Sequence, residues 1–110
     1  MKQEIPWMIR QGDVALVAVE AIPADAVEEP REGSGRVVLA YGEVTGHAHA
    51  LHEPGVKMLC AANQEVFLRV VEPSNLVHEE HAFIAIPPGL YKVVRQREWS
   101  DADESVQVAD

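Results

Sequence analysis

The amino-acid sequence predicts a small all-β domain, built as a closed barrel or a two-sheet sandwich of about six to seven short strands. Valine gathers in short apolar runs of about five residues, a pattern typical of strands. Gly, Pro and acidic residues separate these runs at intervals of roughly eight to twelve residues. No segment carries the apolar periodicity of a long amphipathic helix. The three observations together favour strands and turns along the whole chain.

The expected strands follow one another between clear turn signals. They cover residues 14–19, 36–44, 47–51, 56–60, 66–71, 83–86 and 90–94. The Pro87-Pro88-Gly89 turn predicts that the last two strands form a hairpin. We expect at most one short helical turn, over residues 75–81, because Ser74 can cap it and acidic residues follow.

Length and charge define one domain and limit its partners. A chain of 110 residues, 47% of them apolar and 25% charged, suits a single globular domain over residues 1–97. Residues 98–110 hold Asp and Glu without Lys or Arg and predict an acidic, flexible C-terminal tail. The net charge of −9 argues against nucleic acid as the main partner, and against an anionic membrane surface.

The expected compartment is the cytoplasm. A single cysteine, Cys60, excludes an internal disulfide framework. Residues 1–8 lack the apolar core of a signal peptide, and no apolar run approaches the roughly 18 residues that span a bilayer. We therefore expect a cytoplasmic protein that does not enter the membrane.

All five histidines fall in two short clusters, which are the strongest chemical signal in the chain. His47 and His49 share one face of an expected strand, since side chains alternate along a strand. His52 has the opposite parity, so it is a reserve candidate that joins them only through a bulge or turn. A helical turn would put His78 and His81 on one side, where they could meet the first pair.

This histidine pattern predicts a site for a divalent transition metal. Neutral imidazole is a good ligand for zinc, iron, nickel or manganese, and the two clusters can supply three or four ligands. Three ligands would leave a position for water or for a small-molecule substrate. Glu79 and Glu80 are then the candidate catalytic residues, because a carboxylate beside such a position can move a proton. The sequence leaves open whether the protein is an enzyme and which reaction it would catalyse.

The alternative is a non-catalytic interaction or structural module, phage-associated and oligomeric. The imidazoles would then hydrogen-bond to backbone and carboxylate groups, or face one another across a subunit interface. Exposed edge strands pair readily, so we expect a homo-oligomer under this interpretation.

Three segments resemble a group of small uncharacterised bacterial and phage-encoded proteins. They are IRQGDV at residues 9–14, GEVTGHAH at residues 42–49, and residues 78–99, which contain HEEH, PPGLY and RQREW. This resemblance covers most of the chain and implies no particular activity. A weaker resemblance is to the cupins, since His47 and His49, the downstream Glu53 and the late His78 or His81 look like a cupin ligand set. It implies a metal inside a β-barrel.

Overall fold

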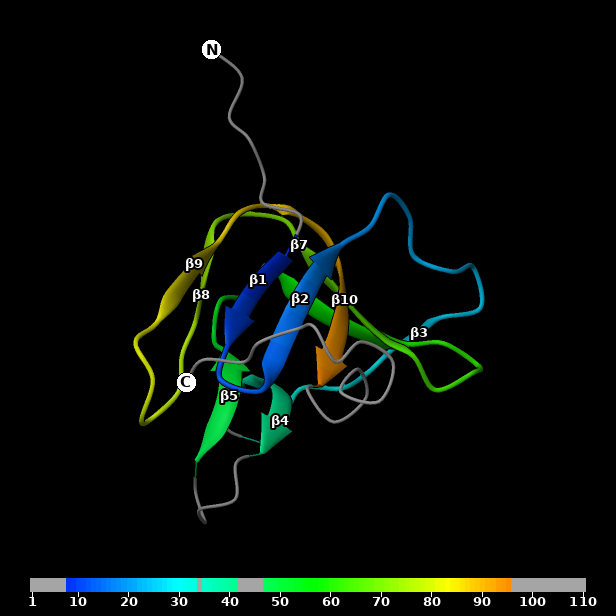
Figure 1. Cartoon of the computed structure of the whole chain (residues 1–110). Helices are drawn as coiled ribbons and strands as arrows, with labels where there is room; N and C mark the ends of the chain where they lie inside the picture. The colour runs from blue at the N-terminus through cyan, green and yellow to red at the C-terminus, as the bar shows by residue number, and fades with distance from the viewer. Residues whose placement is uncertain (1–7, 34, 42–46, 96–110) are drawn as a thin grey trace.

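The computed structural model describes residues 8–33, 35–41 and 47–95, which form ten strands and no helix (Figure 1). The strands are β1 (Met8–Gln11), β2 (Val14–Ala18), β3 (Val27–Glu28), β4 (Val37–Tyr41), β5 (Ala48–Leu51), β6 (Val56–Cys60), β7 (Val66–Val70), β8 (Ser74–Leu76), β9 (Ile84–Ile86) and β10 (Gly89–Arg95). The all-β prediction is therefore confirmed. Each predicted apolar run contains a strand, and β1, β3 and β8 are additional.

Six strands form the larger sheet, in the order β1-β2-β10-β7-β6-β3 with every neighbouring pair antiparallel. The long strand β10 lies between β2 and β7, so that Tyr91 is opposite Ala18 on one side and Leu68 on the other. Among the described residues this order begins at β1 and ends at β3 without closing into a barrel.

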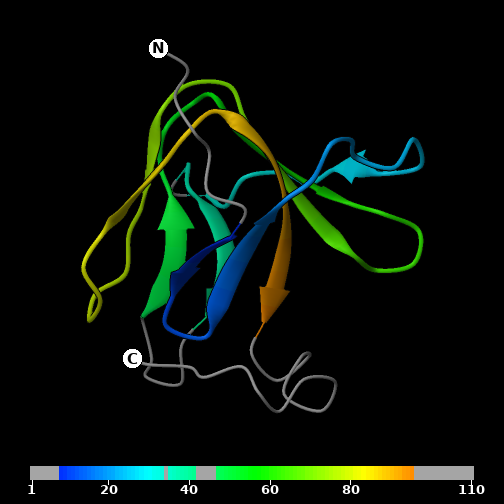
Figure 2. The same ribbon diagram turned by 45° about the horizontal axis from the view of Figure 1, so that its top comes forward.

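A second layer consists of two hairpins, β4–β5 and β8–β9. A single bridge between Ala50 and Val77 joins them, with amide-to-carbonyl distances of 3.0 and 2.9 Å. Figures 1 and 2 show β8 and β9 as a narrow hairpin running beside β5. The bridge thus connects the two hairpins. It also sets the antiparallel register between the residues before Ala50 and those after Val77.

The hydrophobic core lies between the two layers. The larger sheet contributes Leu16, Leu68 and Tyr91, and the second layer contributes Leu51 and Leu76, all fully buried. Alternation along the strands explains the pattern in β10, where Tyr91 and Val93 are buried and the residues between and beyond them are only partly covered. The arrangement corresponds to the sandwich form of the predicted fold.

The one helical turn that the sequence allows, over residues 75–81, does not form. Residues 74–76 form β8 instead, and Leu76 pairs with Ile84. The Ser74 hydroxyl donates a hydrogen bond to the Glu72 carbonyl (2.8 Å) and does not cap a helix. Pairing with β9 and the bridge to Ala50 give this backbone its hydrogen-bond partners. A single isolated helical turn would provide fewer such bonds.

The predicted hairpin between the last two strands is also wrong. β9 pairs with β8, whereas β10 pairs with β2 and β7. Pro87 and Pro88 between them form a corner at which the chain leaves the second layer for the larger sheet. The Tyr91 hydroxyl donates to the Pro87 carbonyl (2.7 Å) and holds this corner.

Some predictions concern residues that the structure does not describe. The acidic tail at 98–110 lies outside the described residues, and so do residues 42–44 of the second predicted strand. Within the described part of the chain, no helix has the length and apolar character of a membrane span.

Candidate metal centre

Four of the five histidines come together at one end of the molecule. The His78 ring lies centrally, with its centroid 4.4 Å from that of His49, 4.6 Å from that of His81 and 5.7 Å from that of His47. The rings of His49 and His81 are stacked at 5.8 Å. Figures 1 and 2 show the start of β5, the β8–β9 connection and the β1–β2 turn at this end. The two sequence clusters therefore form one histidine cluster.

His52 stays apart from this cluster. Its side chain is exposed, and its backbone amide donates to the Glu53 carboxylate (3.2 Å). No ring contact between His52 and the other four histidines occurs among the described residues. The opposite parity of this position along the chain explains the separation, because no bulge reverses it in β5.

The antiparallel register set by the Ala50–Val77 bridge explains how the cluster is assembled. Counting outward from the bridge places His49 opposite His78, the next position opposite Glu79, and His47 opposite Glu80. The observed contacts follow this order. The Ala48 amide donates to Glu79 Oε1 (2.9 Å), and His47 Nδ1 lies 3.5 Å from Glu80 Oε2.

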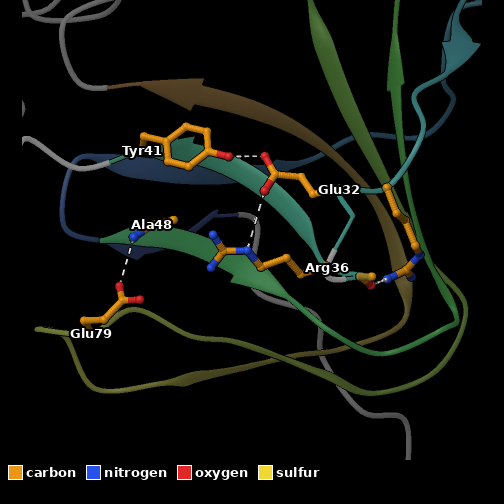
Figure 3. Close-up of polar contacts among 7 residues, drawn as sticks. Glu32, Arg36, Tyr41, Ala48 and Glu79 are labelled. Carbon is orange, nitrogen blue, oxygen red and sulfur yellow. Dashed lines mark hydrogen bonds and ion pairs between the residues drawn. The ribbon is translucent and has the colours of Figure 1, made fainter. Parts of the chain in front are cut away.

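Glu79 is held in place as an anion. Figure 3 shows its carboxylate directed at the Ala48 amide. The hydrogen bond from Ala48 is the main reason why the pKa of Glu79 lies below its usual range, followed by a bond from its own amide and by His47 and His78. A carboxylate with a lowered pKa is a weak base, so Glu79 is better suited to ligate or orient than to accept a proton.

The other polar group in Figure 3, on β4 and the chain before it, contains no histidine. Glu32 accepts a hydrogen bond from the Tyr41 hydroxyl, and its carboxylate lies 3.7 Å from Arg36 Nε. The bond to Glu32 raises the pKa of Tyr41. These three side chains interact with one another, and we assign them no part in the candidate metal centre.

His47 and Glu80 differ from Glu79 in having few fixed partners. The Nδ1 atom of His47 is buried and has no hydrogen-bond partner among the described residues. The Glu80 side chain is 60% exposed and only approaches that atom. His47 thus offers a free nitrogen, and Glu80 offers a carboxylate that remains accessible to solvent.

His78 is partly committed to the backbone. The Glu80 amide donates to its Nδ1 (2.9 Å), so the neutral ring carries its proton on Nε2. Burial lowers the pKa of His78, and His81 lowers it further. Binding of a metal through either nitrogen would replace this hydrogen bond or reverse the tautomer, so it should move the turn that carries Glu80.

Three residues have ligand atoms close enough to share one ion. His47, His78 and Glu79 each offer one such atom, and these atoms all lie within 4.8 Å of one another. Two ligands on a tetrahedral zinc lie about 3.3 Å apart, since zinc–nitrogen bonds are about 2.0–2.1 Å long. Zinc binding would therefore require these side chains to move inward, together with the change at the His78–Glu80 hydrogen bond.

His49 is the most buried member of the cluster, with 2% of its surface exposed. It shares a face of β5 with Leu51, which lies in the core. Its Nδ1 lies 2.8 Å from Oε1 of the buried Gln11, and this oxygen accepts the ring proton because the Gln11 amide nitrogen already donates to two backbone carbonyls. Burial and the neighbouring His78 lower the pKa of His49 to about 4, so the ring is neutral at pH 7.

The β1–β2 turn, which belongs to the larger sheet, packs against the histidine cluster. Gly12 has a φ of +58°, and a Cβ atom placed there would lie only 2.7 Å from His81 Nε2 and 3.2 Å from His49 Cε1. The next residue, Asp13, places its Oδ1 atom 3.3 Å from His49 Nε2. Glycine is therefore required both by the backbone and by the imidazoles packed on it.

Replacing Gly12 with alanine should destabilise the domain by about 1–2 kcal/mol, because the left-handed backbone strains any other residue. The His81 ring must also shift to accommodate the methyl group. Urea unfolding measures the first effect, and the histidine ring signals in NMR spectra report the second. Gly33→Ala is the matched control, since Gly33 has open space around it. Equal stability of both variants would contradict this role for Gly12.

Three residues of the centre were not identified from the sequence: Gln11, Gly12 and Asp13. The segment 9–14 carries the resemblance to other proteins, and no metal-ligand pattern marks it in the sequence. A usable signal was present, because a Gly-Asp pair before the valine run of β2 is typical of a tight turn between two strands. The contact from Gln11 to His49 spans 38 positions, and no local pattern encodes it.

The fold and the cluster define a small all-β domain with four histidines gathered at one end of the molecule. The chain belongs to the family described as a domain of unknown function, DUF8820, which it matches over residues 10–96. The match confirms the resemblance to an uncharacterised family and contains every residue of the centre described above. It adds no support to the weaker resemblance to cupins. No curated protein and no solved structure matches the chain.

Proposed function

We propose that this domain binds one divalent transition metal ion through His47, His78 and Glu79. The observation that carries the proposal is the proximity of three ligand atoms, all within 4.8 Å of one another. They belong to two segments brought together by the Ala50–Val77 bridge. The buried Nδ1 of His47 has no hydrogen-bond partner among the described residues, which supports the proposal further, since a buried polar atom normally has a partner.

The ligand types favour zinc, iron, nickel or manganese. Two imidazoles and one carboxylate form a mixed nitrogen and oxygen set, which suits these borderline ions better than calcium or magnesium. Zinc is the first ion to test, because three protein ligands plus one exchangeable position are typical of its reactive sites. A small molecule or water would take that position.

Of the two candidate catalytic carboxylates, Glu80 is the better placed to move a proton. It is exposed and only approaches His47, whereas the Ala48 amide holds Glu79. We therefore propose Glu79 as a ligand and Glu80 as the group that exchanges a proton with a molecule bound at the metal. The proposal covers metal binding and the roles of these two carboxylates. It assigns no class of reaction.

Zinc titration of untagged protein tests the proposal. We expect His47→Ala and Glu79→Gln to weaken the affinity of this position by at least about tenfold to a hundredfold, while circular dichroism shows an intact fold. His52→Ala is the matched control, because His52 is exposed and lies outside the cluster. We expect this variant to bind zinc as the unmodified protein does.

Two results would overturn the proposal. One is a protein that binds none of the four metals after reconstitution. The other is zinc binding that His47→Ala and His52→Ala leave equally unchanged. Either result would favour the alternative interpretation, in which the histidines stabilise the junction of the two layers or an interface between subunits.

A further inference from the structure

Gln11 connects the larger sheet to the second layer through three hydrogen bonds. It lies on β1 on the same face as the core residue Ile9, and it is 3% exposed. Its carboxamide nitrogen donates to the backbone carbonyls of Leu76 (2.9 Å) and Ala82 (3.0 Å). Its oxygen accepts the proton of His49 Nδ1 (2.8 Å). One buried side chain of β1 thus contacts three points of the second layer.

The partners of the Gln11 carboxamide fix its orientation. Only its NH₂ group can donate to two carbonyl oxygens, and the opposite orientation would face them with another oxygen. An apolar residue in place of Gln11 would leave the buried Leu76 carbonyl without this donor. The side chain therefore has one favourable position, and an apolar residue of the same size cannot reproduce its bonds.

The two carbonyls that this carboxamide binds flank the loop that carries two of the proposed metal ligands. Leu76 is the last residue of β8, and Ala82 precedes β9. Residues 77–81 lie between them and include His78 and Glu79. Because both ends of the loop are bonded to the same NH₂ group, the carboxamide holds the base of the loop against β1.

The third bond of the carboxamide reaches the segment that carries the remaining ligand. His49 lies on β5, two positions after His47. Between them, the Ala48 amide donates to Glu79 Oε1 (2.9 Å), as Figure 3 shows. The carboxamide therefore contacts both segments at the place where they approach each other, and this approach brings the ligand atoms of His47, His78 and Glu79 within 4.8 Å of one another.

We propose that Gln11 is the positioning residue of the metal centre, because its three hydrogen bonds hold the loop of residues 77–81 beside β5. It supplies no ligand atom to the group of three and acts through His49 and the ends of the loop. Residues that orient metal ligands typically change metal affinity by about 10–100-fold when they are replaced. The inference rests on the proposed function and adds to it a residue from the larger sheet.

Competition titration with a zinc chelator tests the inference in untagged protein, under conditions in which circular dichroism shows every variant folded. Gln11→Met removes the donors and the acceptor at similar volume and should weaken zinc binding by about 10–100-fold. Gln11→Glu keeps the size and the acceptor but loses the two donors, so it should also weaken binding. Ile9→Ala is the matched control, because Ile9 is buried on the same face of β1. It should lower stability and bind zinc as the unmodified protein does.

Amide hydrogen exchange tests the position of the loop without any metal. The Ala48 amide reports whether Glu79 stays beside β5, and the Leu68 amide on the central strand β7 reports global unfolding. In Gln11→Met, exchange at Ala48 should rise at least about tenfold more than exchange at Leu68, because the loop opens without global unfolding. In Ile9→Ala, the two amides should accelerate by the same factor. A merely structural contribution of Gln11 would give this second pattern.

Three outcomes overturn the inference, and they can be told apart from failure of the proposed function. Equal zinc affinity of Gln11→Met and the unmodified protein removes the positioning role and leaves the metal centre to be judged by His47→Ala. Equal acceleration of the Ala48 and Leu68 amides in Gln11→Met shows that Gln11 stabilises only the fold. Absence of zinc binding in the unmodified protein overturns both proposals together.

Discussion

Truncation of Leu68 to alanine should destabilise the domain by about 2–5 kcal/mol. Leu68 is fully buried on β7, between β6 and β10, and it belongs to the core cluster formed by both layers. The loss combines the missing apolar contact with the cavity left behind, since strands paired on both sides cannot collapse into the space. A small domain has only about 5–15 kcal/mol of stability in total, so this change removes much of it.

Urea unfolding at pH 7 measures this effect. Val71→Ala is the control, because Val71 directly follows β7 and is 63% exposed. Its truncation should change the free energy of unfolding by less than about 0.5 kcal/mol. A loss below about 1 kcal/mol for Leu68→Ala would mean that the two layers do not pack around this side chain.

Acidification from pH 7 to pH 4 should cost about 3 kcal/mol through His49 alone. Burial and the neighbouring His78 lower the pKa of His49 from 6.5 to about 4 in the folded protein. The unfolded chain therefore binds this proton more readily than the folded chain does. The contribution of neutral His49 to stability is complete above pH 6.5 and is lost as the pH falls from 6.5 towards about 4.

His49→Asn isolates this effect, because asparagine can still donate to Gln11 Oε1 but does not titrate. The free energy of unfolding should fall less steeply between pH 7 and pH 4 in this variant than in the unmodified protein. The remaining slope includes His78, whose pKa burial also lowers. Identical slopes in the two proteins would contradict a buried neutral His49.

The strands of the core could be predicted from the sequence because their signal is local. Valine-rich runs such as Val66–Val70 are separated by turn residues, and alternation fixes which side chains enter the core. Strands β1, β3 and β8 could not be predicted in the same way. They are two to four residues long, and pairing with a distant strand stabilises them more than their own composition does.

The missing helical turn and the wrongly predicted hairpin near the C-terminal end of the domain have the same physical origin. Residues 75–81 carry a local helix signal, and Pro87-Pro88-Gly89 carries a local turn signal. In the structure, long-range pairing takes precedence over both, through the Ala50–Val77 bridge and the position of β10 between β2 and β7. Tertiary context routinely overrides weak local preferences of this kind.

The residue types of the candidate site could be predicted from the sequence. The residues that hold the histidines in place could not. The two histidine clusters are visible in the sequence, but the helical turn expected to align His78 and His81 does not form, and the Ala50–Val77 bridge brings the two segments together instead. The residues that orient and enclose them, Gln11 and Gly12, come from a strand pair far away in the chain. Such contacts between the two layers become visible only once the sheet order is known.

Elemental analysis of untagged protein, purified without chelators and after reconstitution with zinc, tests the metal-binding proposal most directly. An affinity tag of histidines would itself carry metal, so the tag must be absent. The metal-binding proposal predicts at least one tightly bound ion per chain, which His47→Ala loses while its circular dichroism spectrum stays unchanged. A folded protein that holds no zinc, iron, nickel or manganese under any of these conditions would contradict the metal centre.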